Sequence, residues 1–115
     1  MHKTVIFAFR GNPLCFIHVL LNALDMKEKG QDARIIVEGA AVKLIPELEK
    51  EDNPLHMLWK KVKDQELVEG VCRACAAKLG TLAAAESLEL PILDDMSGHP
   101  SMSSYQDKGF EVISF

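Results

Sequence analysis

The distribution of apolar and polar positions divides the chain into alternating strands and helices. Continuous apolar runs rich in β-forming residues predict strands that are covered on both faces. Apolar residues recurring at helical spacing predict helices between those strands. The predicted strands are 4–9, 33–37, the apolar run around Val68 and Val71, 90–93 and 110–115. The predicted helices are 13–29, 44–51, one capped by Asn53, the Ala-rich segment ending at Gly80, 81–88 and 101–108.

The first helix carries the clearest local signals. Asn12 can accept hydrogen bonds at the helix start, Pro13 suits the first turn, and Gly30 supplies a stop. Residue spacing alone predicts which apolar side chains of this helix face the core. The predicted inner stripe is Leu14, Ile17, Leu20, Leu21 and Leu24.

Strands that alternate with helices indicate parallel pairing through right-handed crossovers. We therefore predict one α/β domain over residues 1–115, with a mostly parallel five-stranded sheet in a three-layer α/β/α arrangement. In such a sheet all strand-to-helix loops open on the carboxyl edge, where these folds bind ligands. The loops expected there are 11–15, 38–41, 72–75 and 94–100.

Composition and charge narrow the possible functions. The 115 residues are 48% hydrophobic and 26% charged, which is typical of one globular domain. The net charge of −4 and the lack of a basic block argue against nucleic acid as a partner. The apolar runs 5–9 and 14–21 are shorter than the roughly 20 residues that span a bilayer, and no signal-peptide pattern precedes the first. We expect a cytoplasmic protein without membrane contact.

The cysteines are the candidates for chemistry. Three cysteines, two of them in a Cys-x-x-Cys pair at Cys72 and Cys75, do not resemble a secreted disulfide framework. Cys72 lies where a strand is predicted to become a helix. A helix start offers unpaired N–H groups and a partial positive charge, so we expect a lowered pKa and a reactive thiolate at Cys72. The alternative is that both cysteines are small buried hydrophobic residues.

Cys-x-x-Cys spacing also suits two ligands on one metal ion. A zinc site needs further ligands, and Cys15 and His18 lie one turn apart at the start of the first helix. They could complete a site with Cys72 and Cys75 if the strand order brings the two helix starts together. The alternative places Cys15 in the core and His18 at the surface.

Other polar residues on the same edge are candidate supporting groups. His99, in the loop Ser97-Gly98-His99-Pro100, could act as acid, base or ligand. Arg73 could hold an anion or support a thiolate, and Glu38 follows the second strand. No phosphate-binding glycine fingerprint follows the first strand, where Gly11 stands alone, so we expect no cofactor.

The passage 71–80, the opening 5–10, the loop after the second strand and the terminal 111–115 resemble the DsrE/DsrF-like sulfur-relay family, in element order over nearly the whole chain. The resemblance implies that Cys72, at the strand-to-helix junction, accepts a persulfide sulfur and passes it to a partner. It also implies a homo-oligomer, a trimer or hexamer. The chain departs from the family pattern in its second cysteine, Cys75, and in its Gly98-His99-Pro100 loop.

Three functional hypotheses follow. The first is sulfur transfer, with a persulfide on Cys72, resolution by Cys75, and sulfur donor and acceptor proteins or small thiols as partners. The second is a metal- or small-ligand-binding module that uses Cys72 and Cys75 with Cys15, His18 or His99. The third is a redox-silent subunit that only positions a partner.

Overall fold

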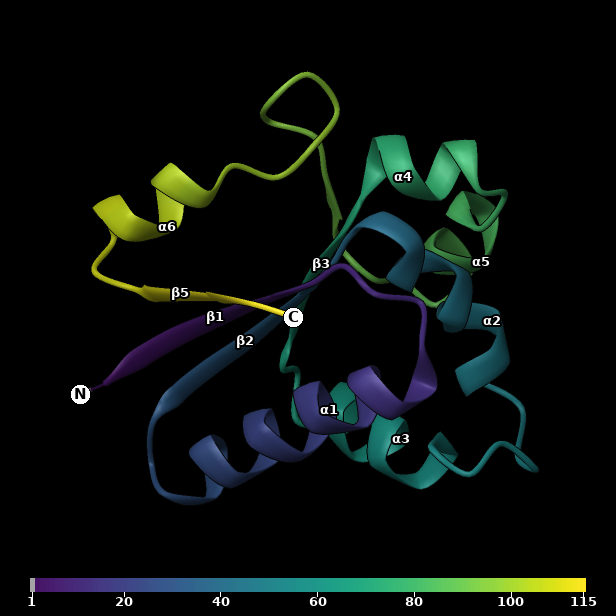
Figure 1. The fold of residues 1–115 in the computed structure, drawn as a ribbon, viewed down its shortest axis with the longest axis horizontal. Coiled ribbons are helices and arrows are strands. Elements are labelled where there is room, and N and C mark those ends of the chain that lie inside the picture. The colour runs from purple at the N-terminus through teal and green to yellow at the C-terminus, as the bar shows by residue number, and fades with distance from the viewer. Residues whose placement is uncertain (1) are drawn as a thin grey trace.

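The computed structural model describes residues 2–115 and contains a five-stranded, all-parallel sheet with strand order β4-β3-β2-β1-β5 (Figure 1). The prediction of an α/β fold with a parallel five-stranded sheet between helix layers is confirmed. The strands are β1 (Lys3–Ala8), β2 (Asp32–Val37), β3 (Val68–Cys72), β4 (Ile92–Leu93) and β5 (Glu111–Ser114).

The helices follow the predicted order with changes at their ends: the N-cap of the helix expected to be capped by Asn53 is Leu55, whose amide donates to Asn53 Oδ1 at 2.8 Å. The segment expected as a loop after β2 forms a short 3-10 helix, η1, and β4 is two residues long. The Pro91 carbonyl accepts from the Val71 amide at 2.8 Å, but Pro91 has no N–H to donate and lies outside β4. The helices are α1 (Pro13–Glu28), η1 (Gly39–Lys43), α2 (Leu44–Leu48), α3 (His56–Asp64), α4 (Arg73–Lys78), α5 (Leu82–Ser87) and α6 (Met102–Asp107).

The strand order explains how the helices are divided between the two faces. From β1 to β4 the chain steps across the sheet in one direction, and right-handed crossovers place the intervening helices on one face. From β4 it returns to the far side of β1, so the same handedness places α6 on the opposite face. Figure 1 shows α6 across the sheet from α1 and α3.

Each face of the sheet has its own apolar core. On the first face, Ile35 and Val37 pack with Phe16 and Trp59, all of them fully or almost fully buried. On the second, Tyr105 packs edge-on against Phe7 and Phe110, with ring centroids 6.0 and 5.8 Å apart. Burying side chains of this size contributes about 1.5–3 kcal/mol each. These two cores fix the sheet whose carboxyl edge carries the candidate site.

The interpretation of α1 is confirmed at its start and wrong in part along its inner face. The Asn12 side chain accepts a hydrogen bond from the Leu14 amide at 2.9 Å, as expected of the cap. Leu20 is fully buried, but Leu14 and Leu21 are 76% and 45% exposed. The helix is apolar almost all round, so spacing alone did not determine which face meets the sheet. The buried residues of α1 are Phe16, Val19, Leu20 and Ala23.

Within residues 2–115, no helix combines the length and the apolar character that crossing a membrane requires.

Candidate metal centre

Three neighbouring strands each deliver part of one side-chain cluster to the carboxyl edge of the sheet. Glu38 directly follows β2, Cys72 is the last residue of β3, and His99 lies in the loop after β4. Cys75 lies in α4, one turn after Cys72. The loops therefore open where parallel strands were expected to place them.

Cys72 serves as the N-cap of α4. Its backbone is extended, with φ −64° and ψ 119°, and its sulfur accepts a hydrogen bond from the Cys75 amide at 3.5 Å. A capping side chain points back over the first turn, so the sulfurs of Cys72 and Cys75 face the same space. Cys72 is fully buried, whereas Cys75 is partly exposed.

A tight hairpin turn places His99. Met96 and His99 exchange two backbone hydrogen bonds, of 2.7 and 2.9 Å, and the residues between them, Ser97 and Gly98, have φ of 51° and 89°. Positive φ at both central positions is the requirement of a two-residue primed turn. The Gly98 carbonyl accepts from the Ala74 amide at 2.9 Å, which fixes the hairpin to α4.

The four side chains converge on one ring nitrogen. His99 Nδ1 lies 3.1 Å from Cys72 Sγ, 3.8 Å from Cys75 Sγ and 3.4 Å from Glu38 Oε2. The four candidate ligand atoms all lie within 4.8 Å of one another. An imidazole nitrogen offers one hydrogen or one lone pair, so it cannot form a full hydrogen bond with all three neighbours. The Cys72 thiol also has the Gly98 carbonyl as an acceptor at 3.6 Å, but Cys75 and Glu38 still compete for the single ring nitrogen.

The pKa of the Cys72 thiol is shifted in the direction opposite to the prediction. Burial raises its pKa to about 12, with further upward contributions from the Cys75 thiol and the Glu38 carboxylate, against the lowering effect of the Cys75 amide. The expected lowering of this pKa at the helix start was wrong. One amide of the six-residue α4 does not compensate for taking a thiolate out of water. Without another positive charge, the thiol stays protonated at neutral pH.

Glu38 is also in an unfavourable place for a charge. Its side chain is only 10% exposed, and burial raises its pKa, against the attraction of His99, which lowers it. His99 Nδ1 is the polar partner found for its carboxylate within the described chain. A buried carboxylate beside two thiols and an imidazole favours a bound cation.

The remaining candidate residues lie outside this cluster. Arg73 forms an exposed ion pair with Asp94 at 3.4 Å. Cys15 and His18 line a separate hollow of about 420 Å³ with Arg10 and Phe115. The strand order does not place the two helix starts side by side, which was the condition for a site that joins Cys15 and His18 to Cys72 and Cys75. In the sheet order β2 lies between β1 and β3, and two strand spacings separate the helix starts by about 10 Å.

The sequence did not identify Glu38 as a ligand. The sequence marked Glu38 only as a candidate supporting residue on the carboxyl edge of the sheet. Its distance along the chain from Cys72 and His99 does not relate it to either residue. Its signal is positional, since it is the first charged residue after the fully buried end of β2. That signal becomes specific only once β2 is known to lie beside β3.

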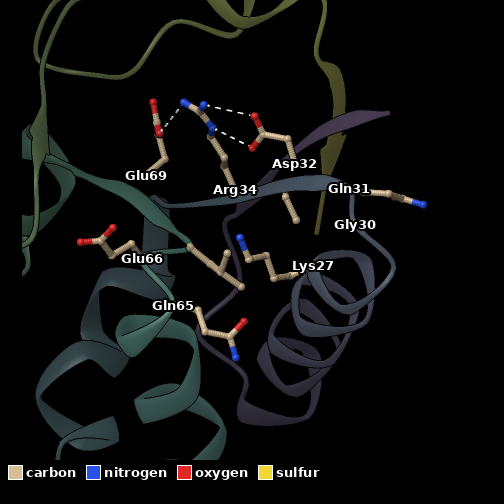
Figure 2. A pocket seen from close by; sticks show the side chains of 10 residues that line it. Lys27, Gly30, Gln31, Asp32, Arg34, Gln65, Glu66 and Glu69 are labelled. Carbon is tan, nitrogen blue, oxygen red and sulfur yellow. Dashed lines mark hydrogen bonds and ion pairs between the residues drawn. The ribbon is translucent and has the colours of Figure 1, made fainter. Parts of the chain in front are cut away.

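A second polar region lies at the opposite, amino edge of the sheet, around a hollow of about 430 Å³ (Figure 2). Arg34 lies between Asp32 and Glu69, with nitrogen–oxygen distances of 3.1 and 3.0 Å. The Tyr105 hydroxyl donates to the other Glu69 oxygen at 2.8 Å. The hydrogen bond to Asp32 and the attraction of Glu69 raise the pKa of Arg34. These charges are already paired.

No known protein-family model matches the chain. The chain is 37% identical over 97 residues to uncharacterized protein MJ0733 of Methanocaldococcus jannaschii, covering 84% of this chain and 77% of that protein. An uncharacterized protein of Archaeoglobus fulgidus is 36% identical over 39 residues, which are 34% of this chain and 64% of that protein. The resemblance to DsrE/DsrF-like proteins is not tested by these relatives and stays a prediction.

Among solved structures, the conserved protein of unknown function BT1422 from Bacteroides thetaiotaomicron superposes with a TM-score of 0.68. The superposition covers 98% of this chain and 95% of that chain at 16% identity, which shows a shared fold alone. The match to the methanogen protein extends over most of both chains. The chain belongs to the same family as uncharacterized protein MJ0733 of Methanocaldococcus jannaschii.

Proposed function

We propose that this protein binds one zinc ion through Cys72, Cys75, His99 and Glu38, and that the ion ties together three loops at the carboxyl edge of the sheet. The observation that carries the proposal is the convergence of two sulfurs and a carboxylate oxygen on His99 Nδ1. A cation between the four atoms would satisfy all of them at once.

The spacing of the ligand atoms supports a tetrahedral ion. Zinc–sulfur bonds of about 2.3 Å and zinc–nitrogen or zinc–oxygen bonds of about 2.0–2.2 Å require ligand atoms about 3.3–3.8 Å apart in a tetrahedron. The three separations measured from His99 Nδ1 are 3.1, 3.4 and 3.8 Å. All six separations lie within 4.8 Å, so binding draws the most distant pair together by roughly 1–1.5 Å at most.

The donor atoms favour zinc over the hard cations. Magnesium and calcium prefer oxygen ligands, whereas two sulfurs with one imidazole suit zinc. Two thiolates balance the double positive charge of the ion, and the carboxylate adds one further negative charge. Zinc removes the proton from a coordinating thiol, so the raised pKa of Cys72 is overcome when the metal binds.

The burial of the ligands supports a structural rather than a catalytic ion. Structural zinc sites use four protein ligands, whereas catalytic sites keep one position for water or substrate. Cys72 is fully buried and the Glu38 side chain is 10% exposed, so two of the four ligands are closed to solvent. The ion would fix the His99 hairpin against α4.

Sulfur transfer from Cys72 stays a prediction. A persulfide carrier needs an accessible thiolate. Cys72 has no exposed surface and a pKa raised to about 12, so it meets a sulfur donor only if the His99 hairpin opens. The cluster geometry supports metal binding more directly.

Zinc titration of protein stripped with a chelator tests the proposal. We expect one zinc per chain in competition with a chromophoric chelator. The Cys75→Ser variant should lose affinity by about 100-fold or more, because a thiolate ligand is removed. Cys15→Ser is the matched control, since that cysteine lies in a separate hollow, and should bind as the wild type does. Absence of zinc binding by the wild type, or equal affinity of the Cys75→Ser variant, would contradict the proposal.

A further inference from the structure

The two cysteines of the cluster differ sharply in access. Cys72 is fully buried beneath His99, while Cys75 is partly exposed, and the neighbouring His99 side chain is 39% exposed. A molecule that approaches the site from solvent therefore reaches Cys75 first. This order is the reverse of the sequence expectation, in which Cys72 reacts and Cys75 resolves.

The two sulfurs are also placed to form a bond with each other. They lie within 4.8 Å, and the Cys75 amide donates to Cys72 Sγ at 3.5 Å. Cys72 is the extended N-cap of α4 and Cys75 lies in its first turn, which is the arrangement of Cys-x-x-Cys pairs that form disulfides at helix starts. His99 Nδ1 lies 3.1 and 3.8 Å from the two sulfurs and can accept a proton from either thiol.

We propose that Cys75 and Cys72 form a dithiol pair that reduces low-molecular-weight disulfides, with Cys75 as the attacking thiol and Cys72 as the resolving thiol, and that the resulting Cys72–Cys75 disulfide releases the zinc. The proposal rests on the proposed function for its zinc part. The substrate class follows from the chemistry, because a dithiol is oxidised by exchange with another disulfide.

The reaction balances in two exchange steps. In the metal-free protein, Cys75 attacks one sulfur of the substrate disulfide, the substrate S–S bond breaks, and a mixed disulfide forms. His99 accepts the Cys75 proton and gives it to the departing thiolate. Cys72 then attacks the Cys75 sulfur and its proton follows the same route to the second departing thiol. The protein loses two electrons and two protons, and the substrate becomes two thiols.

In the zinc form the same two electrons come from the bound thiolates. Oxidation converts two of the four ligands into a disulfide, which is a poor ligand, so only His99 and Glu38 remain for the ion. Zinc leaves as the free ion, and water supplies the protons for the two departing thiolates. The zinc-bound and disulfide states therefore exclude each other.

The test uses oxidised glutathione on the full chain carrying Cys15→Ser, which leaves only the paired cysteines. In metal-free protein with Cys72→Ser added, Cys75 should gain one glutathione, seen by intact mass. With Cys75→Ser added instead, the buried Cys72 should react with glutathione at least about tenfold more slowly than Cys75 does. Cys75→Ala provides a second version of this variant, and circular dichroism confirms that each variant is folded. Equal or faster reaction at Cys72 would overturn the proposal.

The zinc part has a separate readout. Zinc-loaded protein treated with oxidised glutathione should release one zinc per disulfide formed, measured with a chromophoric chelator. A disulfide that forms while zinc stays bound would overturn the exclusion of the two states. If the stripped protein takes up no zinc, the proposed function fails, and the comparison of the two single-cysteine variants still decides which thiol attacks.

Discussion

Two polar clusters lie at opposite edges of the same sheet, and they handle charge in opposite ways. At the amino edge, Arg34 is paired with Asp32 and Glu69, and Tyr105 donates to Glu69 (Figure 2). At the carboxyl edge, two thiols and a carboxylate crowd one nitrogen of His99. The first cluster is complete by itself, whereas the second lacks a positive charge at its centre.

The comparison shows that a hollow and a site are different features. In the hollow of about 430 Å³ at the amino edge, the central charges of Arg34, Asp32 and Glu69 already pair with one another. The cluster around His99 has its four ligand atoms within 4.8 Å of one another, not far above the roughly 3.3–3.8 Å of a tetrahedral zinc site. A cluster of polar side chains that compete for one nitrogen therefore identifies the candidate site better than the volume of a hollow does.

The largest expected effect comes from removing the centre of the carboxyl-edge cluster. His99→Ala should lower zinc affinity by about 100-fold or more, since ligand loss exceeds the 10–100-fold cost of losing an outer partner. Glu38→Gln should cost less, because its amide oxygen can still contact the ion. Competition with a chromophoric chelator measures both. An unchanged affinity in His99→Ala would contradict the ligand set.

The next prediction compares two glycine variants, and it separates the backbone strain of an alanine at positive φ from the positioning of His99 as a metal ligand. Gly98 and Gly109 have similar φ of 89° and 86°, but Gly98 lies in the His99 hairpin and Gly109 follows α6. Replacing either by alanine should lower the free energy of unfolding by about 1–2 kcal/mol, the cost of a left-handed residue. A Cβ at Gly98 also meets Ala74 Cβ at 3.2 Å, whereas at Gly109 it meets open space.

Zinc affinity therefore distinguishes the two glycine variants. Gly98→Ala should weaken binding several-fold, because the hairpin that carries His99 must shift away from α4. Gly109→Ala is the matched control and should leave binding unchanged. Equal affinities in the two variants would show that the hairpin does not position the ligand.

At the amino edge, Arg34→Gln should act on stability alone. The variant leaves Asp32 and Glu69 without their cation and removes the guanidinium that lies 4.8 Å over the Phe110 ring. These groups are partly exposed, so we expect a loss of about 1 kcal/mol in the free energy of unfolding, measured by urea denaturation. A change in zinc affinity would show that the two edges are coupled.

The smallest expected effect is that of Tyr105→Phe. The change removes one hydrogen bond to Glu69 and keeps the ring packed against Phe7 and Phe110. The loss should be about 0.5 kcal/mol, at the low end for a hydrogen bond because Glu69 stays paired with Arg34, with zinc binding unaffected. Urea denaturation measures it. A loss larger than that of Arg34→Gln would show that the Tyr105 hydrogen bond stabilises the amino edge more than the Arg34 ion pairs do.

The sequence predicted the features that local patterns determine. The Asn12 cap, the strand-to-helix position of Cys72 and the place of the His99 loop at the carboxyl edge follow from residue types and spacing. These predictions needed no knowledge of which strands are neighbours. They were enough to place Cys72, Cys75 and His99 on one edge of the sheet.

The rest depended on long-range packing. The strand order β4-β3-β2-β1-β5 brings Glu38 to the two cysteines and keeps Cys15 and His18 away, and no local pattern contains that order. Burial of Cys72, which reversed the expected direction of its pKa shift, likewise comes from the hairpin that covers it. The exposed face of α1 was ambiguous because apolar residues surround the helix.

X-ray absorption at the zinc K-edge of the zinc-loaded protein tests the central claim most directly. The account predicts a four-coordinate ion with two sulfur atoms at about 2.3 Å and two nitrogen or oxygen atoms at about 2.0–2.2 Å. The Cys75→Ser variant should lose half of the sulfur signal. A first shell made only of nitrogen and oxygen, with no sulfur, would contradict the account.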